Sequence, residues 1–386
     1  MITAVGHSEN PLASRALEEV LRQGEDSLQG RNPDLGIFFT SLMDLDFDTV
    51  LSQILEKWPG MQLVGCTTDG EISHTQPSIE CSMALLLIES DKVKFSVGLG
   101  ENLSGNPQAA VNQALDQAGY ALDDDCKLAV VLADGIETFS THMGQALRTG
   151  LGDNFPIFGG CSGDNMQLVK TYQFFNNKVV SDSVVLILVS GPVRFSMSQK
   201  SGWKPIGKLF NIGRYKDNVV WEIDGMKAVD FYRKYLGENF SAYHQFPLAV
   251  EATNSGFFLR DPIDMNSEDG SISFIGTFPE NAWVQLTEFS TDSLIEAASE
   301  ATEDALMTYP GKSADLALLF PCASRRHVLG IKAVEDHRKL IEHRKINSSM
   351  SIFGMYAYGE FAPVKSTGKT YFHNDTYTVL LLGEEL

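Results

Sequence analysis

The sequence predicts an α/β fold of mixed α+β type, in which mixed β-sheets with flanking helices are built from duplicated β-α-β-β units and divided between two domains. Three observations lead to this prediction. A strand–helix–strand unit occurs three times, a returning apolar strand follows each copy, and the chain has 386 residues. A chain of this length exceeds one ordinary hydrophobic core, so two domains are expected.

Each unit runs from an apolar strand through an amphipathic helix to a second apolar strand and a glycine-rich turn. The returning strands lie at residues 83–88, 184–189 and 377–382. A strand that returns after such a crossover runs antiparallel to it, so we expect mixed rather than purely parallel sheets. The first and second strands of the three units begin at Ile37 and Leu63, Leu128 and Ile157, and Leu316 and Ile352.

Apolar residues at helical spacing predict the helices between these strands. Residues 11–23 form the first helix, which Gly24 is expected to end. In the third unit, Ile331, Val334 and Ile341 lie on the apolar face of the connecting helix. The other predicted helices span residues 107–118, 226–236 and the segment from Thr291 to Pro310.

The best candidate for a domain junction is the segment 200–207, which combines glycine, proline and lysine and has no periodic pattern. We therefore expect domains at residues 1–200, with two repeats, and 201–386, with the third. Alternating or apolar runs predict further strands in both domains. They lie at residues 2–5, 94–99, 172–176, 193–198, 218–223, 247–252, 257–260, 271–276 and 283–289.

The composition narrows the class of protein. The formal net charge is −20, from 50 acidic and 30 basic residues, and such a surface repels nucleic acids and anionic membranes. We see neither a signal peptide nor an apolar stretch long enough to span a bilayer. Five widely spaced cysteines do not form a disulfide framework, so a cytoplasmic location is expected.

Several motifs are specific enough to indicate a family. In the first half, LVGCTTDGEI starts at Leu63 and FGGCSGD starts at Phe158. In the second half they are GWKP from Gly202, EIDG from Glu222, YGE from Tyr358 and FHNDT from Phe372. Together they resemble the FIST proteins, which carry an N-terminal and a C-terminal FIST domain.

The resemblance implies a FIST N-like domain at residues 1–200 and a FIST C-like ligand-binding domain at residues 201–386. It also implies a sensor of a small molecule or gas that regulates a histidine kinase or a cyclic-di-GMP enzyme. One branch of the family binds haem and senses nitric oxide, and a free-standing protein of this size is similar to that branch. A homodimer is compatible with the sequence, whereas nucleic-acid and membrane partners are not expected.

Haem requires an axial ligand, usually a histidine in gas sensors. His244 is our candidate metal ligand because Tyr243 and Phe246 would frame its imidazole. The same residue could instead be a partly buried histidine that bonds a backbone carbonyl. His327 is the second candidate, and the preceding Arg325 and Arg326 could hold the haem propionates or be ordinary surface charges.

The other histidines are expected to have no ligand role. His373 lies in the FHNDT motif, where a structural hydrogen bond is the simpler role. His337 and His343 lie in a charged helix, are expected to be solvated, and are six residues apart, which does not suit one metal on a helix. The remaining histidines lie in polar, loop-like contexts, namely His7, His74 and His142.

The sequence does not predict an enzyme, because the common nucleophile, phosphate-binding and zinc motifs are missing. Glu71 and Glu360 occupy matching positions in two repeats, with Asn165 at the third, which indicates a turn-stabilising role rather than acid–base catalysis. Two alternatives to haem sensing stay open. One is a haem-free sensor of an amino acid or other metabolite bound between the domains, and the other is a hydrolase or transferase with Cys66 or Cys161 as nucleophile.

Overall fold

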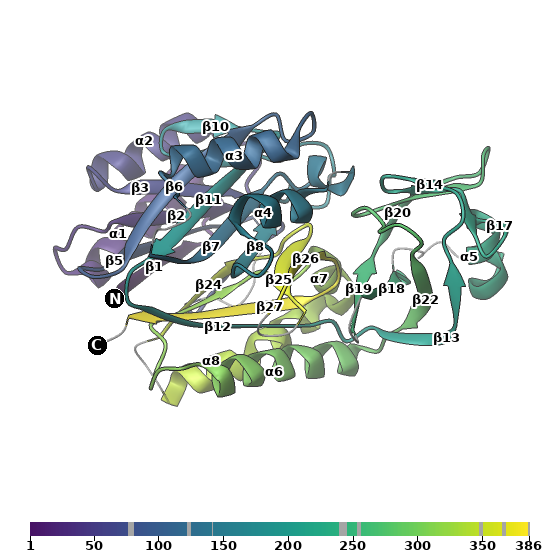
Figure 1. Cartoon of the computed structure of the whole chain (residues 1–386). Coiled ribbons are helices and arrows are strands. Elements are labelled where there is room, and N and C mark those ends of the chain that lie inside the picture. The colour runs from purple at the N-terminus through teal and green to yellow at the C-terminus, as the bar shows by residue number, and fades with distance from the viewer. Residues whose placement is uncertain are drawn as a thin grey trace.

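The computed structural model describes residues 1–75, 81–121, 125–140, 142–238, 245–252, 256–346, 350–364 and 368–384. They form a body of three similar units and a smaller lobe, which stands to one side of the body in Figure 1. The lobe is inserted in the third unit, between its first strand and its first helix. The predicted mixed α/β class is confirmed.

The first unit alternates strands and helices as the sequence predicts. It contains β1 (Ile2–Ser8), α1 (Ala13–Leu28), β2 (Leu35–Thr40), α2 (Phe47–Lys57), β3 (Gln62–Thr67), β4 (Glu71–Ser73) and β5 (Met83–Glu89). The returning strand β5 lies between β1 and β2 and is antiparallel to both, whereas β2 and β3 are parallel. Asp46 begins α2 by accepting a hydrogen bond from the Thr49 amide.

The second unit repeats this order. It contains β6 (Lys94–Glu101), α3 (Pro107–Gln117), β7 (Cys126–Ala133), the short 3-10 helix η1 (Glu137–Ser140), α4 (Met143–Leu151), β8 (Ile157–Cys161), β9 (Gln173–Phe175), β10 (Lys178–Val180) and β11 (Ser183–Ser190). Again the returning strand, β11, lies between β6 and β7. Asn106 caps α3, which has Pro107 at its first position.

The third unit is interrupted by the lobe. It contains β12 (Val193–Lys200), α6 (Thr291–Thr308), β23 (Leu316–Leu319), α7 (Ala323–Leu329), the 3-10 helix η3 (Gly330–His337), α8 (Arg338–Ile346), β24 (Ser351–Met355), β25 (Glu360–Pro363), β26 (Thr370–His373) and β27 (Tyr377–Glu384). β27 lies between β12 and β23, as its counterparts do in the other units. A capping box between Ser290 and Ser293 begins α6.

Each unit donates the strand that follows its glycine-rich turn to the sheet of another unit. β4 of the first unit pairs with β24 of the third, β9 of the second pairs with β3 of the first, and β25 of the third pairs with β8 of the second. All three pairings are antiparallel. The exchange is cyclic, so the three units interlock with approximate threefold symmetry.

The glycine shared by the three second strands has one structural cause. A Cβ atom at Gly65 would lie 1.8 Å from the Phe38 carbonyl oxygen of the adjacent parallel strand. At the equivalent Gly159 and Gly354 the neighbouring carbonyl oxygens would be 2.4 Å and 2.2 Å away. A side chain cannot fit at these three positions, so glycine recurs because the paired strands are in close contact.

The donated strands carry a buried polar residue at matching register positions. Glu71, Gln173 and Glu360 are each paired with the equivalent residue of the neighbouring sheet and are fully buried. The prediction that Asn165 corresponds to Glu71 and Glu360 is therefore wrong. The second unit has a longer loop here, which the Asp164 carboxylate holds by accepting hydrogen bonds from the amides of residues 168–170, so its donated strand starts later.

Two other local predictions were wrong. α1 continues past Gly24 to Leu28, and this glycine lies inside the helix where it packs closely against the Leu87 and Trp58 side chains. In the third unit the predicted helix is broken at Gly330 into α7, η3 and α8. This break leaves Ile331 96% exposed and turns the polar residues Asp336 and His337 inward.

The lobe has its own hydrophobic core. It contains β13 (Lys204–Asn211), β14 (Tyr215–Lys216), β15 (Val219–Val220), β16 (Glu222–Ile223), β17 (Met226–Lys227), α5 (Ala228–Leu236), β18 (Leu248–Ala252), β19 (Gly256–Arg260), β20 (Pro262–Asn266), β21 (Ser271–Phe274) and β22 (Trp283–Glu288). Phe210, Phe231 and Phe274 are buried in this core. Its first and last strands pair with each other, so the lobe leaves and rejoins the body at one place.

The predicted boundary at residue 200 falls at the end of β12. Both sides of it contribute to the same sheets, because β12 pairs with β27 and β8 pairs with β25. The large apolar clusters of the body likewise draw side chains from all three units. Within the part of the chain that the structure describes, no helix is long and apolar enough to cross a membrane.

Candidate functional site

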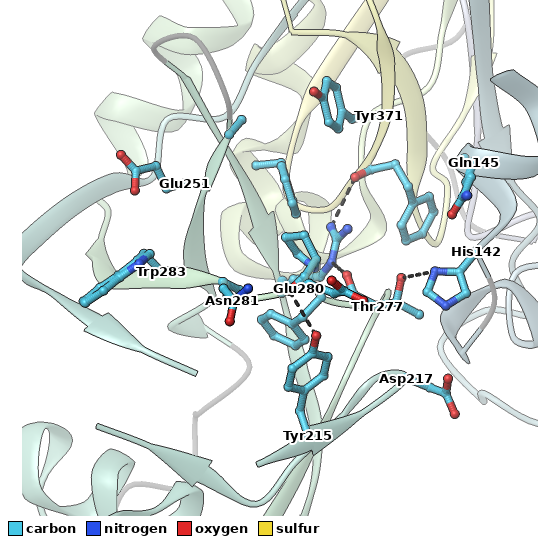
Figure 2. A pocket seen from close by; sticks show the side chains of 18 of the residues that line it. His142, Gln145, Tyr215, Asp217, Glu251, Thr277, Glu280, Asn281, Trp283 and Tyr371 are labelled. Atoms are coloured by element: carbon cyan, nitrogen blue, oxygen red, sulfur yellow. Dashed lines mark hydrogen bonds between the residues drawn. The ribbon is translucent and has the colours of Figure 1, made fainter. Parts of the chain in front are cut away.

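A cleft of about 990 Å³ separates the lobe from the body. The body side is formed by the start of α4, with His142, Gln145 and Arg148, and by Tyr371 and Phe372 of β26. The lobe side comes from the β14–β15 turn, β18, β19 and the segment 277–283 that leads into β22. Figure 2 shows labelled side chains of the body, such as His142 and Tyr371, and of the lobe, such as Tyr215 and Trp283.

Aromatic rings line much of the cleft. Phe258 of the lobe and Tyr371 of the body stack with ring centroids 5.7 Å apart and an angle of 20° between the ring planes. Tyr215 and Trp283 add rings on the lobe side, and Trp283 is 45% exposed. A half-exposed tryptophan in a concave site is a frequent anchor for ligands, because it offers a large rigid surface.

Arg260 ties the lobe to the body at the cleft. Its guanidinium donates hydrogen bonds to the carbonyls of Thr277 at 2.9 Å, Leu259 at 2.8 Å and Phe372 at 3.1 Å. It also lies over the Phe258 ring, 4.3 Å from the centroid. Burial lowers the pKa of Arg260 to about 9, which still leaves it charged at neutral pH. The residue therefore positions the cleft wall.

A second link between lobe and body lies beside Arg260. The Gly276 amide donates to the Phe139 carbonyl at 2.9 Å. The Thr277 hydroxyl lies 3.2 Å from Nδ1 of His142. His142 itself is exposed at the start of α4. A ligand in the cleft would therefore touch residues that directly join the two parts.

Buried carboxyl groups gather where the lobe meets the third unit. Asp261 of the lobe accepts a hydrogen bond from Ser324 of α7 at 2.9 Å, and Glu360 and Asp375 of the body lie nearby. Burial raises the pKa of Asp261, and repulsion by the other two carboxylates raises it further. Burial also raises the pKa of Asp375 to about 7, although Arg325 opposes this shift. Burial and mutual repulsion both favour protonation within this group.

The sequence carries both domains of one family. It matches the FIST N domain over residues 34–226 and the FIST C domain over residues 228–363. The chain belongs to the FIST family. The two matches meet at residues 226–228, inside the lobe, rather than at the predicted residue 200.

One relative of this FIST protein is the uncharacterized protein MJ1623 of Methanocaldococcus jannaschii, which is 24% identical over 269 residues. The match covers 64% of this chain and 50% of MJ1623, so the chain corresponds to about half the length of that relative. Neither the identity nor the coverage of this match indicates which ligand the chain binds.

Solved structures show only distant similarity to this FIST chain. Cyanuric acid hydrolase from A. caulinodans aligns over 100% of this chain and 99% of its own, with a TM-score of 0.39 and 8% identity. PurLQS from Thermotoga maritima aligns over 99% and 72%, with a TM-score of 0.24 and 10% identity. Both similarities are too low to bear on function.

The residues predicted to bind haem are only partly described. His244 and Tyr243 lie outside the described residues. Phe246 is half-buried against the lobe core, and the neighbouring Gln245 carbonyl accepts a hydrogen bond from the Trp203 indole at 3.1 Å. Trp203 in turn lies in one apolar cluster with Leu329 of α7. Of the predicted set, Phe246 therefore lies next to a residue that contacts Trp203.

The two predicted arginines have structural partners. Arg325 is fully buried, pairs with Asp336 at 3.0 Å and donates to the carbonyls of Ser201 and Leu294. Arg326 pairs with Asp69 at 3.2 Å. A guanidinium that is wholly buried and has these partners, as in Arg325, does not fit a haem propionate. His327, by contrast, is exposed.

Histidine contexts differed from the predictions in two places. His337, expected to be solvated, is fully buried, with Nε2 3.1 Å from the Tyr356 hydroxyl, and burial lowers its pKa to about 3. His7, expected in a loop, lies in β1 between Ser73 and Ser82. His373 has the structural role that was expected, since its Nε2 lies 3.0 Å from the Ala362 carbonyl.

The cysteines near the turns are buried. Cys66, Cys161 and Cys322 are at most 2% exposed, and burial raises the pKa of each thiol well above its usual range. A nucleophilic cysteine is normally an accessible thiolate. This environment disfavours the alternative in which Cys66 or Cys161 acts as a nucleophile.

Sequence reasoning missed the cleft because its residues come from five separate segments of the chain. The available signal was weak: aromatic residues such as Tyr215, Phe258 and Trp283 are frequent between residues 204 and 290, but most aromatics there are core. Phe372 belongs to the FHNDT motif, so one motif of the family resemblance includes a residue on the body side of the cleft. The motif gives no information about the residues on the lobe side.

Proposed function

We propose that this FIST protein is a small-ligand sensor whose ligand binds in the cleft between lobe and body. The observation that carries the proposal is the Phe258–Tyr371 stack, in which one ring belongs to β19 of the lobe and the other to β26 of the body. A ligand that contacts both walls favours one relative placement of lobe and body over others.

The connection between the two parts supports this mechanism. The lobe joins the body through one pair of strand ends, where Trp203 and Phe289 pack with ring centroids 5.2 Å apart. Gly202 in this connection has a φ of +88°. The ligand would act on the contacts between Arg260 and Phe372 and between Thr277 and His142, which join the same two parts near the cleft.

The signalling part of the proposal rests on the family resemblance. A partner histidine kinase or cyclic-di-GMP enzyme would read the altered lobe position from the surface of the protein, in the cytoplasm. The protein would act by binding rather than by catalysis. A pull-down with candidate kinases, with and without ligand, tests this part independently of the cleft.

The cleft itself is tested by ligand binding. We expect compounds from a metabolite library to raise the melting temperature of the wild-type protein and to change the fluorescence of Trp283. The Trp283→Ala variant removes a half-exposed ring and should bind at least about tenfold more weakly while keeping the wild-type melting temperature without ligand. Binding that Trp283→Ala leaves unchanged would place the site elsewhere.

Haem and nitric oxide sensing stays a prediction that rests on the resemblance and on His244. When bound, haem would supply the gas-binding iron, and an imidazole would have to ligate it. Among the described histidines, the exposed His142 borders the cleft. Haem titration monitored by the Soret band shows whether haem binds and whether His244 or His142 ligates it. Loss of the band in His244→Ala but not in His142→Ala supports the predicted site, and absence of a band in the wild-type protein contradicts haem binding.

A further inference from the structure

The exposed charged side chains that line the cleft are acidic. Asp217, Glu251 and Glu280 line it, and all three are exposed. None of them forms an ion pair with a residue that the structure describes. They come from the β14–β15 turn, β18 and the segment before β22, and Figure 2 shows them at separate places around the opening.

Both arginines of the cleft are engaged by the protein instead. Arg260 donates to three backbone carbonyls, as described above. Arg148 donates to the Thr370 carbonyl at 2.7 Å, lies 3.7 Å from the Asp153 carboxylate and covers the Tyr371 ring. A carboxylate or phosphate ligand would have to compete with these partners, so the cleft has little to attract an anion.

The rings of the lobe side suit a cation. The ring of Tyr371 is already covered by Arg148, whereas Trp283 and Tyr215 have no cation over their faces among the described residues. Tryptophan and tyrosine faces attract ammonium groups, and methylene chains pack well on the same rings. The formal charge of −20 adds a long-range attraction for polycations.

From these observations we infer that the cleft selects a linear ligand with two or more protonated amines, that is, a di- or polyamine. The inference rests on the proposed function, since it names the ligand class for the same cleft. Three separated carboxylates cannot all meet one ammonium group, but a flexible chain can place an amine at each. The intervening methylene groups would lie against Trp283 and Tyr215.

The test is a calorimetric titration of the full chain with spermidine and with putrescine at low and at physiological salt. We expect saturable binding that weakens with salt. Each of Asp217→Asn, Glu251→Gln and Glu280→Gln should weaken spermidine binding by about 3-fold, and the triple variant by about 20-fold. Glu18→Gln, which removes an exposed carboxylate of α1 far from the cleft residues in sequence, should bind like the wild type.

The possible results separate the two proposals. If the triple variant and Glu18→Gln bind spermidine equally well, the polyamine contacts only the general surface charge, and the inference is wrong. If spermidine does not bind but another library compound does, in a manner sensitive to Trp283→Ala, the ligand class is wrong and the cleft stays a ligand site. If no compound binds the cleft, the proposed function fails as well.

Discussion

The Arg326 guanidinium on α7 lies 3.2 Å from the Asp69 carboxylate at the end of β3, and the two side chains are 11% and 3% exposed. This ion pair joins the third unit to the first, close to the point where the Asp69 amide donates to the Tyr356 carbonyl. Arg326 also covers the Tyr356 ring, 5.6 Å from its centroid. Two glycine-rich turns that are far apart in the sequence are thereby held together.

Removing one partner of this pair should destabilise the protein. Arg326→Gln leaves the nearly buried Asp69 carboxylate without its counter-charge, and we expect a loss of about 3 kcal/mol in the free energy of unfolding. Urea denaturation measures it. Arg338→Gln is the matched control, because its pair with Glu335 is 62% and 39% exposed and should contribute less than about 1 kcal/mol. Equal losses in both variants would contradict the structural role of the Arg326–Asp69 pair.

Gly65 should not tolerate a side chain. The added Cβ of Gly65→Ala would lie 1.8 Å from the Phe38 carbonyl oxygen, so the paired strands must move apart, at a cost of about 3 kcal/mol. Gly144→Ala in α4 is the control, since its nearest neighbour would be 3.5 Å away and alanine favours the helix by about 1 kcal/mol. Thermal unfolding should therefore shift in opposite directions for the two variants.

Glu71 should make the stability depend on pH. Burial raises its pKa to about 7 from 4.5, although Ser82, Thr68 and Ser41 donate hydrogen bonds to its carboxylate. Because the folded-state pKa is the higher one, the contribution of this group is full below pH 4.5 and is lost as the pH rises through 7. Between pH 5 and pH 8 the loss should be roughly 2 to 3 kcal/mol.

The Glu71→Gln variant isolates this contribution. Gln173 occupies the equivalent position in the second unit, where it bonds Ser162 and Ser183, so an amide fits such a cluster. The difference in unfolding free energy between wild type and Glu71→Gln should therefore change across this pH range. A pH-independent difference for Glu71→Gln would mean that Glu71 does not take up a proton on folding.

The lobe should be removable without unfolding the body. Its two ends meet where Lys204 pairs with Glu288, so residues 203–289 can be replaced by a short Gly-Ser linker. We expect this chain to unfold cooperatively and to keep the strand content of the body by circular dichroism, because the apolar clusters shared by the three units lose only Ile275 among their buried members.

A chain that ends at residue 200 should behave differently. It lacks β25 and β27, so β12 loses its partner, β8 keeps only β7, and the shared apolar clusters become exposed. Such unpaired edges favour aggregation. A soluble, cooperatively unfolding monomer of residues 1–200 would show that the first two units are independent of the third.

The sequence predicted most strands and their returning partners because burial leaves an apolar pattern in each strand. It failed where polar residues are buried, as at His337 and Asp336, and where an apolar residue is exposed, as at Ile331. Contacts with Tyr356 and Arg325 decided the burial of His337 and Asp336, whereas the helix break at Gly330 left Ile331 exposed. The residues predicted to bind haem were chosen from their neighbours in the sequence. These neighbours do not show which distant segments contact a side chain. The residues are His244, Tyr243, Phe246 and residues 325–327.

By itself the sequence determined the mixed α/β class, the threefold repetition and the FIST family, since these depend on periodicity, glycine positions and local motifs. Only the tertiary structure decided that each unit lends a strand to its neighbour, that Gln173 rather than Asn165 is the partner of Glu71 and Glu360, and that a cleft separates lobe and body. The physical reason is that these features arise from contacts between distant segments. Local patterning records whether a residue is buried, but not which segment buries it.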